Sequence, residues 1–324
     1  MTNVLHRPDQ PVSVFAPVSV GNVSVGFDSL GLAVTPIDGQ LLGDIVRVKS
    51  SADQQNHLYC SGNYQHSLPE KQEENIVWQC LLSFNQKLLT KKIEVQTVHI
   101  TLEKNTPICS GTGSSACSVV AGLMALNEFY HNPLKQQELL LLMGELEAQI
   151  SGSLHYDNVA PCYLGGLQLM LDDHYEICQS VPTFDDCYWV ISYPDIVVST
   201  KSAREILPDS YGRQTMIQAS RLLAGFIGAS YRQDKSQAFS VLQDVIAEPY
   251  RVSLLKNYAE TKQALLESGS LAVGISGSGP TAFAVCDNID DAKKARQIFD
   301  SIYQKSEHGF TSICKADKMG ARRI

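Results

Sequence analysis

The sequence predicts an α+β protein with two domains, and three observations point to this fold class. The chain has 324 residues, which is enough for a large core and, by length, for two domains. Hydrophobic residues make up 44% of it and charged residues 19%, as in ordinary globular enzymes. Segments with strand and helix periodicity follow one another without the strict alternation that a doubly wound sheet requires.

In the N-terminal half, apolar residues repeat first with strand and then with helix periodicity. Leu42–Ser50 and Val95–Glu103 alternate like strands, and the second places Val98, Ile100 and Leu102 on one face. An amphipathic helix is expected at Asn75–Leu88, with a buried stripe made of Ile76, Val77, Cys80, Leu81, Phe84 and Leu88. The other elements expected here are helices at Ser114–Tyr130 and Lys135–Ile150, and a strand at Leu167–Leu171 that approaches the domain boundary.

The C-terminal half again mixes strands with helices. The strands expected are Tyr188–Ser192, a strand–turn–strand unit built on Gly274–Pro280, and Phe310–Cys314. The helices expected are Arg213–Arg232, Lys235–Ile246, Leu254–Ser268 and Asp290–Gln304. At the other end of the chain, Met1–Pro11 is polar and lacks the apolar region of a signal peptide, so a short extension is expected there.

Charge, hydropathy and cysteine content argue against several classes of function. A net charge of −8 argues against a nucleic-acid partner, and no run reaches the ~18 apolar residues of a membrane span. The nine cysteines are odd in number and none forms a Cys-x-x-Cys pair, so neither a disulfide framework nor a zinc site is expected. Most lie in apolar runs, as small core residues do, and a reducing, cytoplasmic compartment is expected.

The most informative segment is the small-residue loop Pro107–Ser118, which runs into an apolar helical pattern. Gly111 and Gly113 allow backbone conformations that other residues avoid, and they let a ligand approach the main chain. Ser114 and Ser115 can cap the following helix, whose first turn offers N–H groups and a positive dipole end to a phosphate. No acidic or basic residue occurs from 105 to 127, so no local charge competes for or repels an anion. On this segment alone, an ordinary Gly/Ser connector remains the alternative.

The loop is not one of the two commonest nucleotide-binding loops. No Gly-Lys-Ser/Thr occurs in the chain, which rules out a Walker A loop. The Gly-x-Gly pair lacks the third glycine of a dinucleotide fingerprint, which argues against a cofactor-binding oxidoreductase.

Two further segments, Phe15–Asp28 and Gly274–Thr281, identify the kind of loop. Together with Pro107–Ser118, in this order and at these distances, they resemble the three motifs of the GHMP kinases, the superfamily named for galactokinase, homoserine kinase, mevalonate kinase and phosphomevalonate kinase. Within it the chain resembles the homoserine kinases, through His155–Pro161, Ser199–Pro208 and Ala247–Arg251. The resemblance covers the chain from about Val14 to Arg322. It implies a nucleotide-binding domain like the second domain of ribosomal protein S5 at 12–170, with its phosphate loop at 107–118, and a ferredoxin-like domain at 171–324.

The resemblance also implies ATP as phosphoryl donor and Mg²⁺ as cofactor. The ATP-binding residues implied are Pro107, Ile108, Cys109, Ser110, Gly111, Thr112, Gly113, Ser114, Ser115, Ala116 and Cys117 in the loop. Asn75, Ile76 and Val77 match the region that lines the adenine. Glu147 and Ser114 match the family's magnesium ligands, which can be few because Mg²⁺ keeps several waters. Glu145 lies two positions from Glu147 and therefore on another helix face, where we expect it to be solvated. A solvated helix face is also the alternative for Glu147.

Asp157 matches the aspartate that meets the substrate hydroxyl in this family, and with Glu147 and Ser114 it completes the implied catalytic set. The first motif begins Phe15-Ala16-Pro17, so it lacks the lysine that accompanies this aspartate in some superfamily members. We therefore expect positioning and electrostatics to outweigh general-base catalysis. A turn-forming role is the alternative for Asp157. His155 is expected to contact the substrate or to hold the turn rather than to transfer protons.

The implied substrate, L-homoserine, is a small zwitterion. Arg204 and Arg251 match the family's carboxylate-binding arginines, and the planar guanidinium suits a carboxylate. Asn22 and Asp28 match the groups around the ammonium, and Thr200 adds a contact. Without the resemblance, either arginine would be interpreted as a surface residue. A homodimer is the family expectation.

Three departures from the family pattern and two rival hypotheses remain. Thr112 stands where Leu is usual, Gly21 where Ala is common, and Ser24-Val25 where other members carry Gly-Pro. None removes a catalytic group, so the departures bear on loop dynamics and nucleotide affinity. One rival is a kinase of mevalonate, a sugar or shikimate, acceptors that lack the ammonium Asp28 would bind. The other is a non-catalytic sensor of ATP and metabolite, which would normally have lost one of the catalytic residues.

Overall fold

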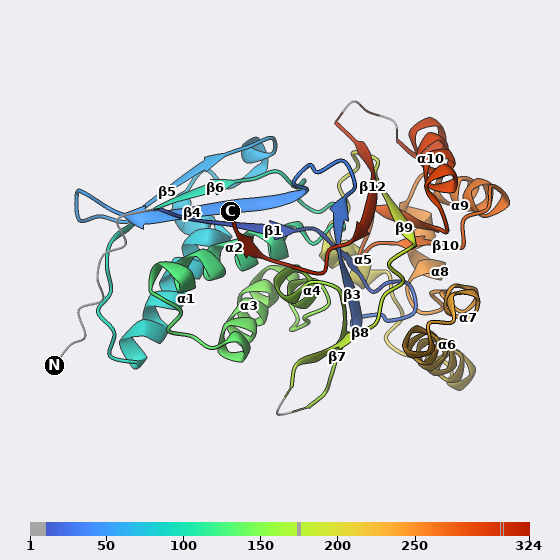
Figure 1. The fold of residues 1–324 in the computed structure, drawn as a ribbon, viewed down its shortest axis with the longest axis horizontal. Coiled ribbons are helices and arrows are strands. Elements are labelled where there is room, and N and C mark those ends of the chain that lie inside the picture. Colours follow the sequence, from blue (N-terminus) through green and yellow to red (C-terminus); the bar gives the residue numbers. More distant parts are fainter. Residues whose placement is uncertain (1–10, 174–175, 305, 307) are drawn as a thin grey trace.

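The computed structural model describes residues 11–173, 176–304, 306 and 308–324, which form two β-sheets with helices packed against them (Figure 1). This mixture of layers confirms the predicted α+β class. The predicted N-terminal extension lies outside the described residues, apart from Pro11. Among the helices of the described residues, none combines the length and the apolar character needed to cross a membrane.

The first sheet contains the strand that opens the first motif. It consists of β1 (Val12–Pro17), β4 (Gly43–Ser50), β5 (His57–Ser61), β6 (Val98–Glu103) and β13 (Arg322–Arg323). The order is β13-β1-β4-β6-β5, and only β5 and β6 run parallel to each other. Burial alternates along β6, so Val98, Ile100 and Leu102 share the core face as the sequence predicts.

Four helices lie against one face of this sheet (Figure 1). They are α1 (Ile76–Thr90), α2 (Ser114–Phe129), α3 (Gln136–Ser151) and α4 (Val159–Leu164). α2 packs on β1 and β4 and is flanked by α1, α3 and α4. Its sequence explains this central place, because it is apolar on all sides and Val119, Val120, Leu123 and Leu126 are all fully buried. The phosphate loop therefore leads into α2, a helix that is packed against other elements on all sides.

The second sheet joins strands from both halves of the chain. It consists of β2 (Ser19–Gly21), β3 (Leu30–Pro36), β7 (Leu167–Met170), β8 (Cys178–Val181), β9 (Tyr188–Tyr193), β10 (Ala272–Ile275), β11 (Ala282–Cys286) and β12 (Phe310–Ala316). The order is β10-β11-β9-β12-β3-β7-β8, with β2 paired to β3, and every pairing is antiparallel. β3 thus joins strands of the C-terminal half, while β13 joins the first sheet. The division into domains at residue 170 stays a prediction.

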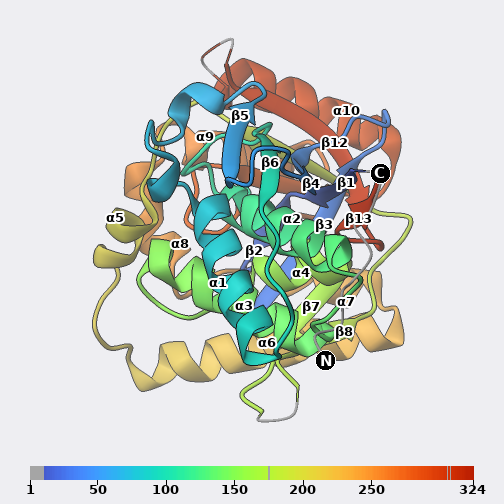
Figure 2. The ribbon, with the colours of Figure 1, turned by 90° about the vertical axis from the view of Figure 1, so that its left-hand side faces the viewer.

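The remaining helices surround the second sheet. They are α5 (Thr200–Glu205), α6 (Arg213–Arg232), α7 (Lys235–Ser240), α8 (Glu248–Arg251), α9 (Tyr258–Glu267) and α10 (Ile289–Ile298), and a π-helical turn (Phe299–Tyr303) extends α10. α10 packs on β9, β11 and β12, and α9 packs beside β10. Figure 2 shows α6 lying along one edge of the molecule. The short helices α5 and α8 carry Arg204 and Arg251.

Two C-terminal helices are shorter than their periodicity predicts. The helix expected at Lys235–Ile246 ends at Ser240, because the Asp244 carboxylate accepts three successive backbone N–H groups and stabilises a turn instead. The helix expected at Leu254–Ser268 begins only after Asn257, whose left-handed backbone (φ 63°) interrupts the helical path.

β3 runs so close to the turn carrying Asp157 that only glycine fits at one position. A Cβ added to Gly31 would lie 1.7 Å from the Asp157 carbonyl oxygen and 2.8 Å from the Pro161 side chain. Because the first obstacle is backbone, the turn must move if any side chain is introduced.

We expect Gly31→Ala to lower the free energy of unfolding by about 1–3 kcal/mol, because overpacking forces a backbone shift. Gly225→Ala is the matched control, since its nearest neighbours are Val241 methyls at 3.7 Å and a helical site favours alanine by up to ~1 kcal/mol. Urea denaturation of both variants measures the difference. A Gly31→Ala protein as stable as Gly225→Ala would contradict this packing.

Candidate active site

The three motifs meet at one cavity of about 440 Å³. Most of the predicted site residues line it, namely Asn22, Asp28, Ile108, Cys109, Ser110, Gly111, Gly113, Ser114, Ser115, Glu147, His155, Asp157, Thr200, Arg204 and Arg251. They come from the first motif, the phosphate loop, α3, the turn before α4, α5 and α8. Segments more than 200 residues apart in the sequence thus line the same cavity.

The third motif is hydrogen-bonded to the phosphate loop. The Ser276 hydroxyl donates to the Gly111 carbonyl at 2.6 Å, and the Thr281 N–H donates to the Ser110 carbonyl at 2.9 Å. A Cβ on Gly111 would lie 2.5 Å from the Ser276 carbonyl oxygen, so close backbone approach requires this glycine. The first motif adds the Ser19 N–H, which donates to the Thr112 carbonyl at 3.1 Å.

The first turn of α2 faces the cavity without a side-chain cap. Gly113 is its N-cap, in the left-handed conformation (φ 67°), and the described part of the chain provides no side-chain capping hydrogen bond there. The prediction that Ser114 and Ser115 cap this helix is therefore wrong. The Ser114 hydroxyl donates instead to the Thr106 carbonyl at 3.2 Å, and the Ser115 hydroxyl donates to Glu147 Oε1 at 2.5 Å. The uncapped turn keeps N–H groups and the helix dipole for an anion.

A buried lysine that the sequence analysis missed holds this helix end in place. Lys104 is 2% exposed, and its three N–H donors share four oxygens within hydrogen-bond distance of Nζ: Asp44 Oδ2 at 2.6 Å, the Ser114 carbonyl at 2.8 Å, Ser118 Oγ at 2.9 Å and Thr106 Oγ1 at 3.0 Å. Asp44 also accepts the backbone N–H groups of residues 105 and 106. Both charges are thus fully compensated, as burial demands.

We expect Lys104→Met to lower the free energy of unfolding by about 3–5 kcal/mol, because it leaves the Asp44 carboxylate buried without its cation. The exposed pair of Lys91 and Glu138, 2.7 Å apart, gives a matched control, and Lys91→Met should cost at most about 1 kcal/mol. Combining Lys104→Met with Asp44→Asn should recover part of the loss. Equal losses for the two lysines in urea denaturation would contradict the argument.

Glu147 presents a carboxylate to the cavity wall. Its side chain is 9% exposed, and desolvation raises the pKa of the carboxyl while the Ser115 hydrogen bond acts in the opposite direction. Glu145 is exposed, as the helix-face argument predicted. Carboxylate and hydroxyl oxygens are the ligands that Mg²⁺ prefers, so Glu147 and a loop serine fit this ion. Ser115 is the serine bonded to Glu147, whereas the hydroxyl of Ser114, the predicted ligand, faces Thr106.

Asp157 is the buried acid at the centre of the cavity. It is 4% exposed, and its pKa is raised from 3.8 to about 7, mainly by desolvation and then by the charges of Asp28 and Glu147, while Arg204 lowers it. Asn158 donates to Asp157 Oδ2 at 3.2 Å and is itself held by Ser19 at 2.9 Å. A buried acid whose pKa lies near neutrality is typical of catalytic sites.

His155 lies beside Asp157 but is poorly placed for proton transfer. The distance from His155 Nδ1 to Asp157 Oδ1 is 3.9 Å, which is longer than a hydrogen bond. Burial lowers the pKa of His155, and this favours the neutral ring. That His155 contacts a substrate or holds the turn stays a prediction.

The two predicted carboxylate-binding arginines flank the Phe27 ring, with their guanidinium carbons 5.7 Å (Arg204) and 5.4 Å (Arg251) from its centroid. Arg204 forms a two-bond ion pair with Asp28, with Nη1–Oδ2 and Nη2–Oδ1 both at 3.0 Å. Arg251 donates to the carbonyls of Gly277 at 2.8 Å and Ala203 at 3.1 Å. The cavity therefore ends in a region with two cations and one carboxylate.

Some predicted ATP-binding residues lie behind the cavity wall. Pro107, Thr112, Ala116, Cys117, Asn75 and Val77 are buried and do not line it. Asn75 caps α1 by accepting the Val77 N–H at 2.9 Å, and Val77 lies in the core. Ile76, the third residue matched to the adenine region, does line the cavity, together with Leu68 and Gln79. The thiol of Cys109 has its pKa raised by burial, which disfavours a thiolate there.

Comparison with known proteins agrees with this geometry. The GHMP kinase N-terminal domain model matches residues 75–166, and the GHMP kinase C-terminal model matches residues 231–305. The crystal structure of homoserine kinase from Cytophaga hutchinsonii is 33% identical with a TM-score of 0.88, covering 99% of this chain and 100% of that one. The chain belongs to the GHMP kinases. It therefore has the two-domain GHMP kinase fold, and it is a kinase, an enzyme class that transfers phosphoryl groups.

More distant GHMP kinases share the fold. Phosphomevalonate kinase of Streptococcus pneumoniae is 11% identical with a TM-score of 0.68, covering 97% of this chain and 99% of that one. Mevalonate kinase of L. major, solved with R-mevalonate, is 13% identical with a TM-score of 0.69, covering 98% and 100%.

One departure from the GHMP kinase pattern has a structural reason. A Cβ on Gly21 would lie 2.8 Å from Asp157 Oδ2 and 2.9 Å from the Asn158 amide nitrogen. Glycine at this position lets the first motif approach the buried acid closely. Thr112, in the place of the usual Leu, is buried and bonds through its hydroxyl to that of Ser110 at 2.7 Å.

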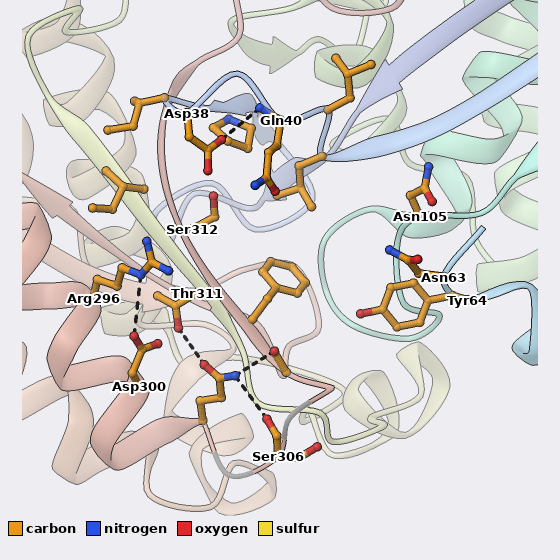
Figure 3. Close-up of a pocket in the computed structure, with 18 of the residues that line it drawn as sticks. Asp38, Gln40, Asn63, Tyr64, Asn105, Arg296, Asp300, Ser306, Thr311 and Ser312 are labelled. Carbon is orange, nitrogen blue, oxygen red and sulfur yellow. Dashed lines mark hydrogen bonds and ion pairs between the residues drawn. The ribbon is translucent and has the colours of Figure 1, made fainter.

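The structure also has a larger cavity, of about 1030 Å³, between the β3–β4 connection and the elements β12 and α10 (Figure 3). Asp38, Tyr64, Arg296 and Asp300 line it, and none of the predicted site residues does. Polar groups of its wall hydrogen-bond to one another. The Gln304 amide, for example, donates to the carbonyls of residues 306 and 309. Cavity size alone therefore does not identify the active site.

Proposed function

We propose that this GHMP kinase is a homoserine kinase, which transfers the γ-phosphoryl group of ATP to the side-chain hydroxyl of L-homoserine and makes O-phospho-L-homoserine for threonine biosynthesis. The observation that carries the proposal is the grouping of Asp28, Arg204 and Arg251 beside Asp157 in the same cavity as the phosphate loop. Two cations and a carboxylate complement an amino acid, whose carboxylate and ammonium sit on one carbon. The 33% identity to the Cytophaga hutchinsonii homoserine kinase supports the same substrate.

The phosphate loop and α2 would bind the ATP phosphates. The uncapped first turn of α2 supplies N–H donors, and the small residues of the loop allow close contact. Glu147, with Ser114 or Ser115, would hold Mg²⁺, which in phosphoryl transfer neutralises charge on the phosphates. Ile76 and its neighbours form the apolar wall where the adenine would lie.

Asp157 would accept a hydrogen bond from the substrate hydroxyl and hold its oxygen in line with the γ-phosphorus. Its neighbours Asn158 and Ser19 fix the carboxylate, so the orientation is set before the substrate arrives. With a pKa of about 7, the carboxyl can also take the hydroxyl proton as the phosphorus–oxygen bond forms. Arg204 and Arg251 would bind the carboxylate, and Asp28 with Asn22 would bind the ammonium.

Two alternatives keep the fold and change the function. A kinase of another small hydroxylated metabolite would need no carboxylate at Asp28. A non-catalytic sensor would need no acid like Asp157, which is costly to bury. We also propose a cytoplasmic homodimer, as the family resemblance suggests.

A coupled assay of ADP release with L-homoserine, L-serine, mevalonate and galactose tests the substrate. We expect L-homoserine to give a kcat/KM at least about tenfold above any other compound, because only it offers both charges at the correct distance from the hydroxyl. A higher kcat/KM with mevalonate or galactose would favour the first alternative. ATP binding without turnover of any compound would favour the sensor.

The raised pKa of Asp157 predicts the pH dependence of this reaction. Because the folded-state pKa is raised, the carboxyl is protonated below about pH 7, and kcat/KM for L-homoserine should rise with pH through about 7. Asp157→Asn should abolish this rise and lower kcat by at least ~10²-fold while leaving the KM for ATP nearly unchanged. Turnover within threefold of wild type would remove Asp157 from the mechanism.

A further inference from the structure

Asp28 and Arg204, two of the residues that we propose to bind the substrate, form an ion pair with each other. The ion pair joins the first motif to α5 across 176 residues of sequence, through two bonds of 3.0 Å. Each side chain is 33% exposed and both line the active-site cavity, so the pair forms part of the cavity wall. Arg251 takes no part, because its guanidinium is held by backbone carbonyls.

The pair leaves the Arg204 guanidinium incompletely satisfied. Its Nε is buried and has no hydrogen-bond partner among the residues that the structure describes, although both terminal nitrogens bond to Asp28. A buried donor without an acceptor costs free energy, so the ion pair does not satisfy all the hydrogen-bonding capacity of the Arg204 guanidinium. An acceptor that let the guanidinium turn could satisfy Nε as well. The Phe27 ring, whose centroid is 5.7 Å from the Arg204 guanidinium carbon, offers a flat surface along which such a turn can keep its cation–π contact.

We propose that Asp28 and Arg204 form a latch that only a zwitterion opens without loss, by exchange of partners. This rests on the proposed function, in which the substrate ammonium goes to Asp28 and its carboxylate to Arg204. A zwitterion replaces both ends of the broken pair. A ligand with one charge must break the same pair and leaves the other member unpaired in a partly desolvated wall. The pair therefore selects against molecules that carry only one of the two charges.

The exchange also keeps the field at the buried acid constant. Asp28 raises the pKa of Asp157 and Arg204 lowers it. A zwitterion brings one positive and one negative charge, so it compensates both influences together. A ligand with a single charge would unbalance them.

Two fragments of homoserine test the latch: 4-hydroxybutanoate, which lacks the ammonium, and 3-aminopropan-1-ol, which lacks the carboxylate. Asp28→Asn should lower kcat/KM for L-homoserine yet raise it for 4-hydroxybutanoate about 3- to 10-fold, because Arg204 loses its competitor. Arg204→Gln should raise kcat/KM for 3-aminopropan-1-ol by a similar factor and lower it for L-homoserine. Independent subsites predict no gain in either case, and the absence of both gains would overturn the latch.

Matched controls come from the same helix. Lys201→Gln and Glu205→Gln each change one charge on exposed side chains of α5, 85% and 64% exposed, and should leave all three values within twofold. Equal gains in these controls would mean that net charge, not partner exchange, is responsible. Thermal unfolding and the KM for ATP check that each variant is folded.

Calorimetric binding of the same three compounds separates this proposal from the proposed function. If the wild type does not phosphorylate L-homoserine, the proposed function fails, and the dissociation constants still report on the latch. Tighter binding of 4-hydroxybutanoate to Asp28→Asn than to wild type supports it. Equal or weaker binding, with 3-aminopropan-1-ol likewise unimproved in Arg204→Gln, contradicts it.

Discussion

The buried contact between Lys104 and Asp44 is the interaction on which the active site depends. Four oxygen atoms within 3.0 Å of one ammonium tie β4, the segment after β6 and the first two turns of α2 into one unit. Two charges in the core are tolerated only because every bond is made, and that requirement fixes the start of α2 to the sheet. Because α2 is fixed, the end of the phosphate loop that joins it is fixed too. On its other side the loop is hydrogen-bonded to residues 276 and 281 of the third motif. Core packing thus holds in place the N–H groups that we propose to bind the ATP phosphates.

Asp157, the acid that we propose to meet the substrate hydroxyl, is in the opposite electrostatic situation, because burial disfavours its ionisation. Raising the pKa of Asp157 from 3.8 to about 7 corresponds to about 4 kcal/mol against ionisation, which the fold must bear at higher pH. Because the folded-state pKa is raised, this cost is absent below the unfolded pKa and grows as pH rises towards 7. Lys104 and Asp44 neutralise each other, and the main charges that act on Asp157 are those of Asp28, Glu147 and Arg204. The fold therefore separates the ion pair of Lys104 and Asp44, which stabilises the scaffold, from the carboxyl of Asp157, whose ionisation is disfavoured.

The sequence predicted the elements whose evidence is local and failed where partners are distant. The buried faces of α1 and β6 follow from periodicity, and the glycines of the loop follow from backbone freedom. Nothing local indicated that Lys104 would meet Asp44, or that Asp28 would pair with Arg204, because those partners lie 60 and 176 residues apart. The capping prediction for Ser115 failed for the same reason: a glutamate 32 residues away offers its hydroxyl a charged acceptor. A lysine just before a loop without charges was the one available signal for Lys104.

The two cavities show what distinguishes a reactive site from a hollow. The larger one is lined by groups that bond to their own wall or face solvent, as with Arg296 and Asp300, 3.7 Å apart and about half exposed. The smaller one is lined by groups whose hydrogen bonds or charges are not fully compensated within the described residues. They are the uncapped end of α2, the buried acid Asp157 with its raised pKa, and Arg204, whose Nε has no acceptor. Each of these can be satisfied by one part of a ligand that carries phosphate, hydroxyl, ammonium and carboxylate groups. Incomplete satisfaction, rather than volume, is what a substrate can convert into binding and orientation.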